Sequence, residues 1–421
     1  MKKKLLCIAL CLVMVAAAVC ALVACEDDAI VVWVGEGTKE FTEQKLKEWN
    51  ETNEYDVKFN FKVEMVSESK AAGDAIQKQQ SAADIFCFAQ DQLARLVESG
   101  LLAPLNATSQ QAVTDSCDDG SIAAATINGT IRAFPMTADN GYFMYYDKRV
   151  ITADVDETSL ESLIAACEAA GKKFSMNLTK DGGSWYAASF FYATDENGDS
   201  LCKSEWTVNE NGKFTKYDDN FRSDNGVIAL KGMQKLLLSS CHQDSADVGD
   251  FNAANASAVV ISGIWDYNAA KTALSDQPGD GKYLGVAALP SFEVDGNKYE
   301  MRTYLGSKLV GVKRQSDATQ AILLQKVAMY LTSEAVQQAR FELVGWGPSN
   351  KNLQDSAAVK ASVALSVLHT EGKTVLQGQY PTNWWAKVEA LTLSAKTATT
   401  DGALLAILST YKDGLDSLKN G

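Results

Sequence analysis

Residues 30–99 alternate between short apolar runs and amphipathic stretches, and this alternation limits the fold more than any other feature of the chain. Short apolar or alternating runs predict strands, and apolar residues spaced three and four apart predict helices. The elements are a strand at 30–34, a helix at 41–50, a strand at 57–63, a helix at 67–81, a strand at 85–89 and a helix at 92–99. This β-α-β-α-β order favours an α/β protein with a mostly parallel sheet and helices on both faces.

The rest of the chain predicts a second α/β unit. Asn128-Gly129 and Asn211-Gly212 are typical of tight hairpins, and Thr158 with Glu161 predicts a capping box ahead of a helix. Further elements are a strand at 142–146, a helix at 227–238, a strand at 258–261, a helix that Trp265 opens, a strand at 304–312, a helix from 318 that continues past a break at Ser333 to about 341, and a helical tail. Since no Gly/Ser/Pro-rich linker separates the halves, we expect two lobes joined by ordered crossings.

The first 25 residues have the layout of an export signal. Three lysines give a basic start, residues 5–23 are almost all apolar, and small Ala24 precedes Cys25. A run of this length also suits a membrane-spanning anchor, but Ala24 and the cysteine match a cleavage site better. L-V-A-C at 22–25 resembles a bacterial lipoprotein signal, which implies that Cys25 carries a lipid; A-A-V-C, ending at Cys20, is a weaker candidate.

The charge balance argues against nucleic acid as a partner and against a body that lies flat on anionic lipid. The chain has 39 Lys and Arg against 53 Asp and Glu, a net charge of −14. Loss of the signal would remove three of these Lys and no acid, which changes the net charge to about −17. An acidic surface repels phosphate groups, so we expect a soluble body.

The cysteines favour neither a disulfide framework nor a zinc site. Five lie beyond Cys25, at positions 87, 117, 167, 202 and 241, and none forms a C-x-x-C pair. Cys87 and Cys167 lie in apolar patterns and are expected in the core. The sequence leaves open one disulfide between two of the other three, Cys117, Cys202 and Cys241.

Signs of catalysis are sparse. His242 and His369 are the two histidines of the chain, and the sequence contains neither G-x-S-x-G nor H-E-x-x-H. The acidic run 195–199 fails the spacing of a calcium loop. We therefore expect no catalytic residue, metal or cofactor, and keep a glycosidase with paired carboxylates as the enzyme alternative.

The loop Gly35-Glu36-Gly37 follows the first predicted strand. A dinucleotide fingerprint would need a third glycine where Glu40 stands. The loop still places Glu36 at the C-terminal end of a strand, where open α/β sheets bind ligands. Glu36 is therefore a candidate ligand-binding residue.

Aromatic residues gather at the starts of loops and helices. One tryptophan alone usually belongs to the core, but a sugar needs flat rings for its C–H faces and polar groups for its hydroxyls. The set comprises Trp33, Trp185-Tyr186, Trp265 with Tyr267, Trp346 and Trp384-Trp385. As a set, these residues favour a carbohydrate site.

Motifs spread over nearly the whole chain carry a family resemblance. They are V-V-W-V-G-E-G at 31–37, A-D-I-F-C-F-A-Q-D-Q-L-A-R-L-V-E-S-G-L-L-A-P-L at 83–105, F-P-M-T-A-D-N-G-Y-F-M-Y-Y-D-K at 134–148, I-S-G-I-W-D-Y at 261–267, A-A-L-P at 287–290 and Y-P-T-N-W-W at 380–385. In this order and spacing they resemble the extracellular solute-binding proteins (family 1) of bacterial ATP-driven (ABC) sugar importers, and most closely the maltose/maltodextrin-binding type.

The resemblance implies specific ligand-binding residues. Acidic and polar positions of the family match Glu64, Asp91, Gln92 and Asp139. Trp265 matches a tryptophan that stacks on a glucose ring, and Trp384 or Trp385 matches a second one, with no choice between the two. The Glu and Tyr expected around residues 180–182 are missing, and Trp185 or Tyr186 is the expected substitute.

The resemblance also implies an architecture and a role. Two α/β lobes of the type II periplasmic-binding-protein fold would follow a signal peptide at 1–24 and a lipid-anchored linker at 25–29. The lobes would comprise residues 30–138 with 303–342, and residues 139–302 with 343–421. We expect a monomeric, lipid-anchored receptor outside the cell membrane that closes on an α-glucan oligosaccharide and passes it to the membrane subunits of an ABC transporter. Another oligosaccharide, or a starch-binding adhesin without transport, is the alternative.

Overall fold

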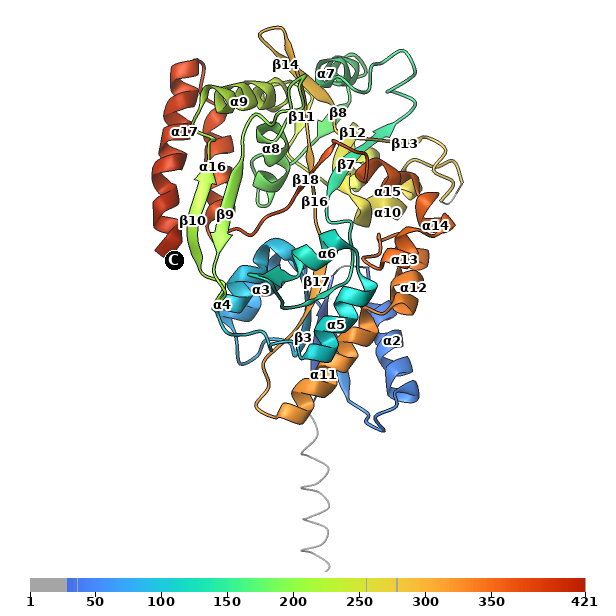
Figure 1. Cartoon of the computed structure of the whole chain (residues 1–421). Helices are drawn as coiled ribbons and strands as arrows, with labels where there is room; N and C mark the ends of the chain where they lie inside the picture. Colours follow the sequence, from blue (N-terminus) through green and yellow to red (C-terminus); the bar gives the residue numbers. More distant parts are fainter. Residues whose placement is uncertain (1–28, 36, 255, 278, 421) are drawn as a thin grey trace, which may run out of the picture.

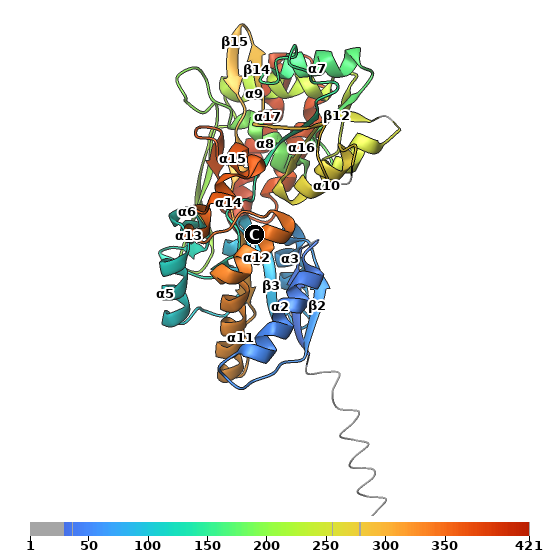
Figure 2. The same ribbon diagram turned by 90° about the vertical axis from the view of Figure 1, so that its right-hand side faces the viewer.

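The computed structural model describes residues 29–35, 37–254, 256–277 and 279–420, so the predictions for Cys25 and Glu36 lie outside it. Figures 1 and 2 show two lobes, one above the other, each built on a β-sheet covered by helices. We call the lobe that contains the first strands the N-lobe and the other the C-lobe. The predicted two-lobe α/β class is confirmed.

The N-lobe sheet has the strand order β2-β1-β3-β17-β6 within the described residues. Its strands are β1 (Ile30–Val34), β2 (Phe61–Met65), β3 (Ile85–Ala89), β6 (Phe134–Pro135) and β17 (Lys308–Val312). β1 pairs in parallel with β2 and β3, whereas β17 runs antiparallel to β3 and β6. The sheet is therefore mixed rather than mostly parallel, because β17 returns from the C-lobe in the opposite direction.

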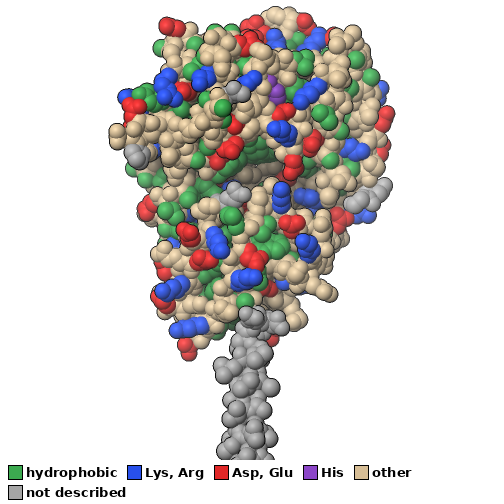
Figure 3. All heavy atoms as spheres, turned by 180° about the vertical axis from the view of Figure 1, so that it is seen from behind, with side chains coloured by type: hydrophobic (Ala, Val, Ile, Leu, Met, Phe, Trp, Pro, Cys, Tyr) green, Lys and Arg blue, Asp and Glu red, His purple; other side chains and the backbone are tan. Residues whose placement is uncertain are grey.

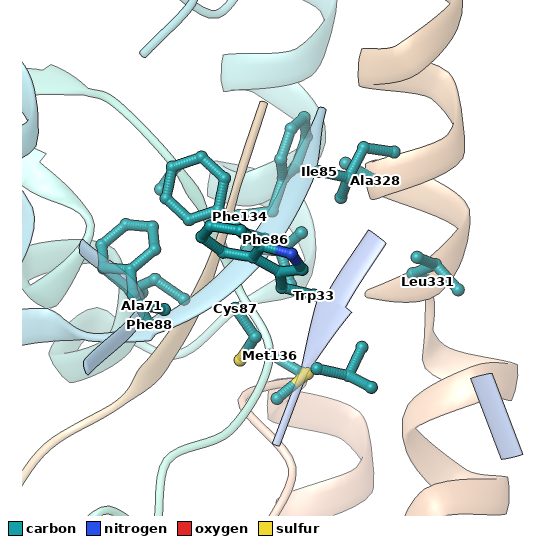
Figure 4. Close-up of a cluster of buried hydrophobic side chains, with 14 of the residues drawn as sticks. Trp33, Ala71, Ile85, Phe86, Cys87, Phe88, Phe134, Met136, Ala328 and Leu331 are labelled. Atoms are coloured by element: carbon teal, nitrogen blue, oxygen red, sulfur yellow. The ribbon is translucent and has the colours of Figure 1, made fainter. Parts of the chain in front are cut away.

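Helices cover both faces of the N-lobe sheet. They are α2 (Lys39–Thr52), α3 (Glu68–Gln77), α4 (Leu93–Glu98), α5 (Ala107–Ser116), α6 (Asp119–Ala124), α11 (Ala318–Leu331) and α12 (Glu334–Val344). Figure 4 shows part of the core, where Trp33, Phe86 and Phe134 of the sheet lie near Ala328 and Leu331 of α11. The predicted break at Ser333 is confirmed, since α12 starts directly after it.

The C-lobe sheet has the strand order β11-β8-β12-β7-β13 within the described residues, and it is mixed as well. Its strands are β7 (Tyr142–Asp147), β8 (Lys173–Ser175), β11 (His242–Gln243), β12 (Ser257–Gly263) and β13 (Leu284–Ala287). β8 pairs in parallel with β11 and β12, and β7 is antiparallel to β12 and β13.

The helical tail of the chain packs on the C-lobe. The C-lobe helices are α7 (Leu160–Ala169), α8 (Gly183–Phe191), α9 (Asp224–Leu237), α10 (Tyr267–Ala273), α15 (Val363–Leu368), α16 (Trp384–Ala395) and α17 (Asp401–Leu415). α16 lies against α8, and α17 lies against α9. Because these contacts are between distant parts of the sequence, the periodicity of the tail alone does not predict which lobe the tail packs on.

Within the described residues, the chain crosses between the lobes in three places that lie side by side. The first crossing follows β6, the second precedes β17 and the third follows α12. The Ala138 N–H donates to the Gly347 carbonyl oxygen at 3.0 Å, and the Asn140 N–H donates to that of Gly306 at 2.9 Å. These bonds make the junction an ordered hinge region. The lobe boundaries given above remain a prediction, since α13 (Lys351–Gln354), after the third crossing, still bonds to the N-lobe through Gln354 and Asp118.

Two local predictions are wrong. The expected strand 304–312 is divided into β16 (Thr303–Leu305), which pairs with β18 (Thr374–Leu376), and β17, because the chain passes between the lobes at Gly306. Helix α7 is capped by Ser159, whose side chain accepts the Ser162 N–H, and not by Thr158. The carboxylate of Glu161 is instead engaged by the Glu293 N–H.

Both predicted hairpins are present. Asn128 and Gly129 have φ of 47° and 77° between β4 (Thr126–Ile127) and β5 (Thr130–Ile131), as a tight turn requires. Asn211-Gly212 closes the hairpin of β9 (Ser204–Val208) and β10 (Phe214–Asp219). Smaller elements are the hairpin β14 (Ser291–Val294) with β15 (Asn297–Glu300), and α14 (Ala357–Lys360).

Two further features bear on the sequence predictions. In the described part of the chain, no helix has both the length and the apolar character needed to cross a bilayer. Cys87 and Cys167 are buried as predicted, and all five cysteines in the described residues are free thiols.

Candidate functional site

The carboxyl ends of the parallel strands in both lobes meet at the space between the lobes. Gly35 follows β1 and Gln90 follows β3 in the N-lobe, and Trp265 follows β12 in the C-lobe. Figure 3 shows a hollow at this level, with hydrophobic side chains in its depth and charged side chains around it. We call this hollow the interlobe cleft. Ligands of open α/β sheets bind at such strand ends.

Half-buried tryptophans from three elements form one side of the cleft. Trp265 lies after β12, Trp185 in α8 and Trp385 in α16. The ring centroids of Trp265 and Trp185 are 5.9 Å apart. The buried ring of Tyr304 connects Trp185, at 6.3 Å and nearly parallel, to Trp385, at 6.0 Å and edge-on. We call Trp265, Trp185 and Trp385 the tryptophan row.

Trp384 and Trp385 have different environments although they are adjacent. Trp384 is 0% exposed, stacks on Tyr380 at 4.0 Å, and donates its indole N–H to the Tyr411 hydroxyl at 3.0 Å. Trp385 is half-buried and donates its indole N–H to Asp91 Oδ2 at 3.0 Å. Trp384 therefore belongs to the C-lobe core, and Trp385 is the one that borders the cleft.

Trp185 and Tyr186 are also adjacent residues with different environments. The Tyr142 hydroxyl donates to the carbonyl oxygens of both residues, at 2.9 and 3.3 Å, and so fixes the start of α8. Tyr186 is buried against Tyr142. The Trp185 indole nitrogen is buried without a hydrogen-bond partner among the described residues, whereas the residue as a whole is half-buried.

Asp91 is held under Trp385 at the start of the N-lobe helix α4. Its side chain is 5% exposed, and desolvation raises the pKa of the carboxyl, while the charge of Arg95 works in the opposite direction. Its hydrogen bond to Trp385 spans 294 residues of sequence. In this arrangement Asp91 fixes the edge of a ring that borders the cleft.

Gln92 turns away from the cleft. Its amide group donates to the Glu68 and Ser69 carbonyl oxygens at 3.0 Å and accepts the Ala72 N–H at 3.3 Å. These bonds hold α3 against the start of α4. The structure thus separates Gln92 from the predicted ligand-binding residues.

Lys308 and Glu68 form a buried ion pair beside the cleft. Nζ of Lys308 lies 3.2 Å from Glu68 Oε1, with side chains 6% and 13% exposed. The ammonium also lies 3.5 Å from the ring centroid of Trp346 and 5.4 Å from that of Trp265. A side chain at Gly35 would collide with the Glu68 carboxylate. The pair therefore lies close against the backbone after β1 and places a cation between two indole faces.

Asp139 lies in the first crossing and not on the cleft surface. It is 0% exposed, and its Oδ2 accepts the Gly347 N–H at 2.5 Å. Desolvation raises the pKa of its carboxyl, while the nearby Lys308 charge lowers it. Asp139 thus ties the first crossing to the third.

Glu64 lies on β2, at the edge of the N-lobe sheet. Its carboxylate accepts the Trp33 indole N–H at 3.0 Å and pairs with Lys62 at 2.8 Å. The hydrogen bond from Lys62, followed by that from Trp33, lowers the pKa of Glu64. The carboxylate is thereby held as an anion by its own neighbours on β1 and β2.

The mouth of the cleft carries a contact between the lobes. Lys70 of α3 and Asp181, in the loop before α8, lie 3.9 Å apart, and both are exposed. That loop is anchored by Asp244, which accepts the N–H groups of Leu178 and Thr179 at 2.9 and 3.0 Å. Asp244 therefore supports the segment that leads into Trp185.

Sequence reasoning missed Tyr304, Glu68 and Lys308. Lys308 is a charged residue at the start of an otherwise apolar strand, K-L-V-G-V. This contrast is the sequence signal that could have marked Lys308 as a candidate site residue. Glu68 follows a strand end, as candidate ligand residues do, but nothing in the sequence pairs it with Lys308. Among the described residues no group of His, Cys, Asp or Glu is arranged to hold a metal ion.

Comparison with known proteins agrees with this architecture. A model of the family described as bacterial extracellular solute-binding protein matches residues 40–367. No curated protein matches the chain in sequence. One solved structure, described as a complex with acarbose, is 24% identical and covers 93% of this chain and 99% of its own, with a TM-score of 0.75.

Two further solved structures share the fold. The GacH receptor of Streptomyces glaucescens GLA.O, solved unliganded and with acarbose, is 19% identical over 93% of this chain and 98% of its own, with a TM-score of 0.72. The maltodextrin binding protein MalE1 from L. casei BL23, solved without ligand, is 19% identical over 91% and 98%, with a TM-score of 0.70. At these identities the likeness establishes the two-lobe fold.

Proposed function

The chain belongs to the bacterial extracellular solute-binding proteins, and from this we propose that it is a receptor for maltose and malto-oligosaccharides that serves an ATP-driven importer. The family consists of binding proteins and not of enzymes, and it acts outside the cytoplasm. The observation that carries the choice of ligand is the tryptophan row. Solved proteins of the same fold are described as binding acarbose or maltodextrin, which supports an α-glucan ligand.

The tryptophan row suits an oligosaccharide better than a small ion or an amino acid. Each pyranose ring presents an apolar C–H face, and an indole ring buries that face without needing a matching charge. The ring centroids of Trp265 and Trp185 lie 5.9 Å apart, and this distance allows adjacent sugar units to meet adjacent rings.

Lobe closure gives the second half of the function. The ordered crossings allow the two cleft walls to approach each other, which buries a sugar between the tryptophan row of the C-lobe and the facing wall of the N-lobe. A membrane transporter would then recognise the closed arrangement. Transport itself requires the importer subunits as partners.

Calorimetric titration of residues 26–421 with maltose, maltotriose and longer malto-oligosaccharides tests the ligand, with xylo- and cello-oligosaccharides as controls. We expect saturable binding of the α-glucans alone, at micromolar or lower Kd. Binding of a control sugar instead would keep the receptor role and change the substrate. Binding confined to insoluble starch would favour an adhesin, and release of products from the oligosaccharide would favour a glycosidase.

We further propose that the protein is held at the membrane by a lipid on Cys25. The support is the L-V-A-C sequence at residues 22–25, directly after an apolar signal. In cell fractionation, Cys25→Ser should move the protein from the membrane to the soluble fraction, whereas Cys20→Ser should leave it in place. The reverse result would make Cys20 the modified residue.

A further inference from the structure

The β9–β10 hairpin reaches from the C-lobe to the N-lobe, away from the three crossings (Figure 1). Its turn glycine, Gly212, has φ of 82°, and an added Cβ there would collide with the Ala94 carbonyl oxygen and lie 2.6 Å from the Glu98 nitrogen. Phe214 follows the turn and is 3% exposed. The hairpin tip is thus packed directly on the backbone of α4.

A pocket of about 240 Å³ lies beside this tip. The N-lobe contributes Arg132, Arg314, Glu98 and the apolar Leu102, and the hairpin contributes Glu210 and Asn211. We call it the hairpin pocket. Its size gives room for several waters or for one small organic molecule.

The two arginines of the hairpin pocket retain unused donors. Arg132 donates from Nη2 to the Glu210 carbonyl oxygen at 3.0 Å, and its Nε is buried without a partner among the described residues. Arg314 donates from Nε to the Gly100 carbonyl oxygen at 3.1 Å. Neither guanidinium forms an ion pair with a carboxylate of the described residues within 4.0 Å. Each backbone contact fixes one end of an arginine and leaves the remaining N–H groups for a ligand.

Guanidinium groups in this state bind oxyanions, and carboxylates in particular, because their paired N–H groups match two carboxylate oxygens. The pocket also contains the exposed side chains of Glu98 and Glu210, which would repel a bare, highly charged anion. The same carboxylates accept hydrogen bonds from hydroxyl groups. The lining therefore favours one carboxylate together with hydroxyl groups over inorganic phosphate or sulfate.

We propose that the hairpin pocket is a second binding site, separate from the interlobe cleft, for a small hydroxylated carboxylate such as a sugar acid. The carboxylate lies between Arg132 and Arg314, and the hydroxyl groups face Glu98, Glu210 and Asn211. Since the arginines belong to the N-lobe and the hairpin to the C-lobe, the bound acid contacts both lobes at once. The site does not depend on the identity of the ligand in the cleft.

Titration with gluconate and with sorbitol at constant ionic strength tests this site, because the two probes have similar chains of hydroxyl groups and one of them lacks the carboxylate. We expect saturable binding of gluconate, measured by calorimetry and by a rise in Tm, and no binding of sorbitol or phosphate at the same concentrations. Arg314→Gln and Arg132→Gln should each weaken gluconate binding at least tenfold. Arg222→Gln, the same charge change at an exposed arginine outside the pocket, should stay within twofold.

The two sites can be distinguished by their variants. Trp265→Ala should leave gluconate binding unchanged, and Arg314→Gln should leave malto-oligosaccharide binding unchanged within twofold. Arg314 is exposed, so its variant reports on the pocket even where Arg132→Gln lowers the stability of the fold. Equal responses to gluconate and sorbitol, or gluconate binding that survives both arginine substitutions, would overturn the proposal.

Discussion

The two walls of the interlobe cleft are built from different chemistry. The C-lobe wall consists of half-buried indole rings, and the N-lobe wall contains charged groups such as the Lys308–Glu68 pair, whose two charges balance each other within the protein. A ring face stays available for a ligand while its edge is held, as the Trp385–Asp91 bond shows. The difference suggests that the C-lobe wall supplies most of the binding free energy and that the N-lobe wall supplies shape and fixed charge.

The largest expected effect comes from breaking the N-lobe ion pair. Lys308→Met leaves Glu68 as a buried charge without its cation, and such a change typically costs about 3–5 kcal/mol of unfolding free energy. Urea unfolding of the variant measures the loss. The double variant Lys308→Met with Glu68→Gln should recover a large part of it. A loss below about 1 kcal/mol would mean that the pair is solvated and is not a rigid part of the wall.

On the C-lobe wall, Trp265→Ala should weaken malto-oligosaccharide binding by about 1–3 kcal/mol, as for a buried aromatic hot spot. Trp265→Phe keeps a smaller ring and should lose less. Calorimetry gives both values, and circular dichroism checks that each variant is folded. Unchanged affinity in a folded Trp265→Ala protein would remove Trp265 from the site.

The stability that Asp244 provides by anchoring the loop before Trp185 should depend on pH. Burial raises the pKa of Asp244, but hydrogen bonds from Thr179 and the Leu178 backbone outweigh it, and the pKa falls to about 2. A folded pKa below the unfolded value of about 3.9 stabilises the protein above that pH, and the stabilisation is lost as the pH falls toward 2. After allowance for partial exposure, its size is about 2 kcal/mol at most.

Asp244→Asn tests this dependence. At pH 6 the variant should be less stable than the native chain by up to about 2 kcal/mol, and the difference should shrink between pH 4 and pH 2. Urea unfolding at pH 6, 4 and 3 measures it. A difference that stays constant over this range would show that the carboxylate charge of Asp244 does not hold the loop before Trp185.

A smaller effect tests how the walls are joined. If Asp91 acts by holding the Trp385 edge, Asp91→Ala should weaken sugar binding by about 1 kcal/mol, the size of one hydrogen bond. In the Trp385→Phe background, where a smaller aromatic ring remains but the N–H is gone, Asp91→Ala should cost nothing more. An equal cost in both backgrounds would instead place Asp91 in direct contact with the sugar.

The sequence predicted the local parts of the fold well. The strand at 85–89 and the turn at Asn128-Gly129 depend on neighbouring residues, and both lie where the pattern placed them. The division of 304–312 depends on partners far away, because Tyr304 pairs with Val375 and Lys308 pairs with Ala89. The local pattern of a segment read as one strand cannot show that its two halves belong to different sheets.

The candidate site was predictable only in part, for the same reason. Resemblance and aromatic content pointed to Trp265, and to Trp384 or Trp385, but the choice between the last two depends on contacts with Tyr411 and Asp91 that no periodicity shows. The Lys308–Glu68 pair joins positions 240 residues apart. Such pairs arise from packing, so a single sequence gives no spacing rule for them.

The smallest effect concerns the mouth of the cleft, where Lys70 and Asp181 face each other across the two walls. Both side chains are exposed, so the pair should contribute less than about 1 kcal/mol and should weaken with salt. Lys70→Gln should therefore change sugar Kd by less than about fivefold at low salt, and the change should disappear near 1 M NaCl, where screening acts within about 3 Å. The reversed pair, Lys70→Asp with Asp181→Lys, should restore the native Kd, because it restores the attraction between the walls. If the reversed pair binds no better than Lys70→Gln, Lys70 contacts the ligand itself. The N-lobe wall then contributes a direct interaction with the sugar in addition to those of the C-lobe wall.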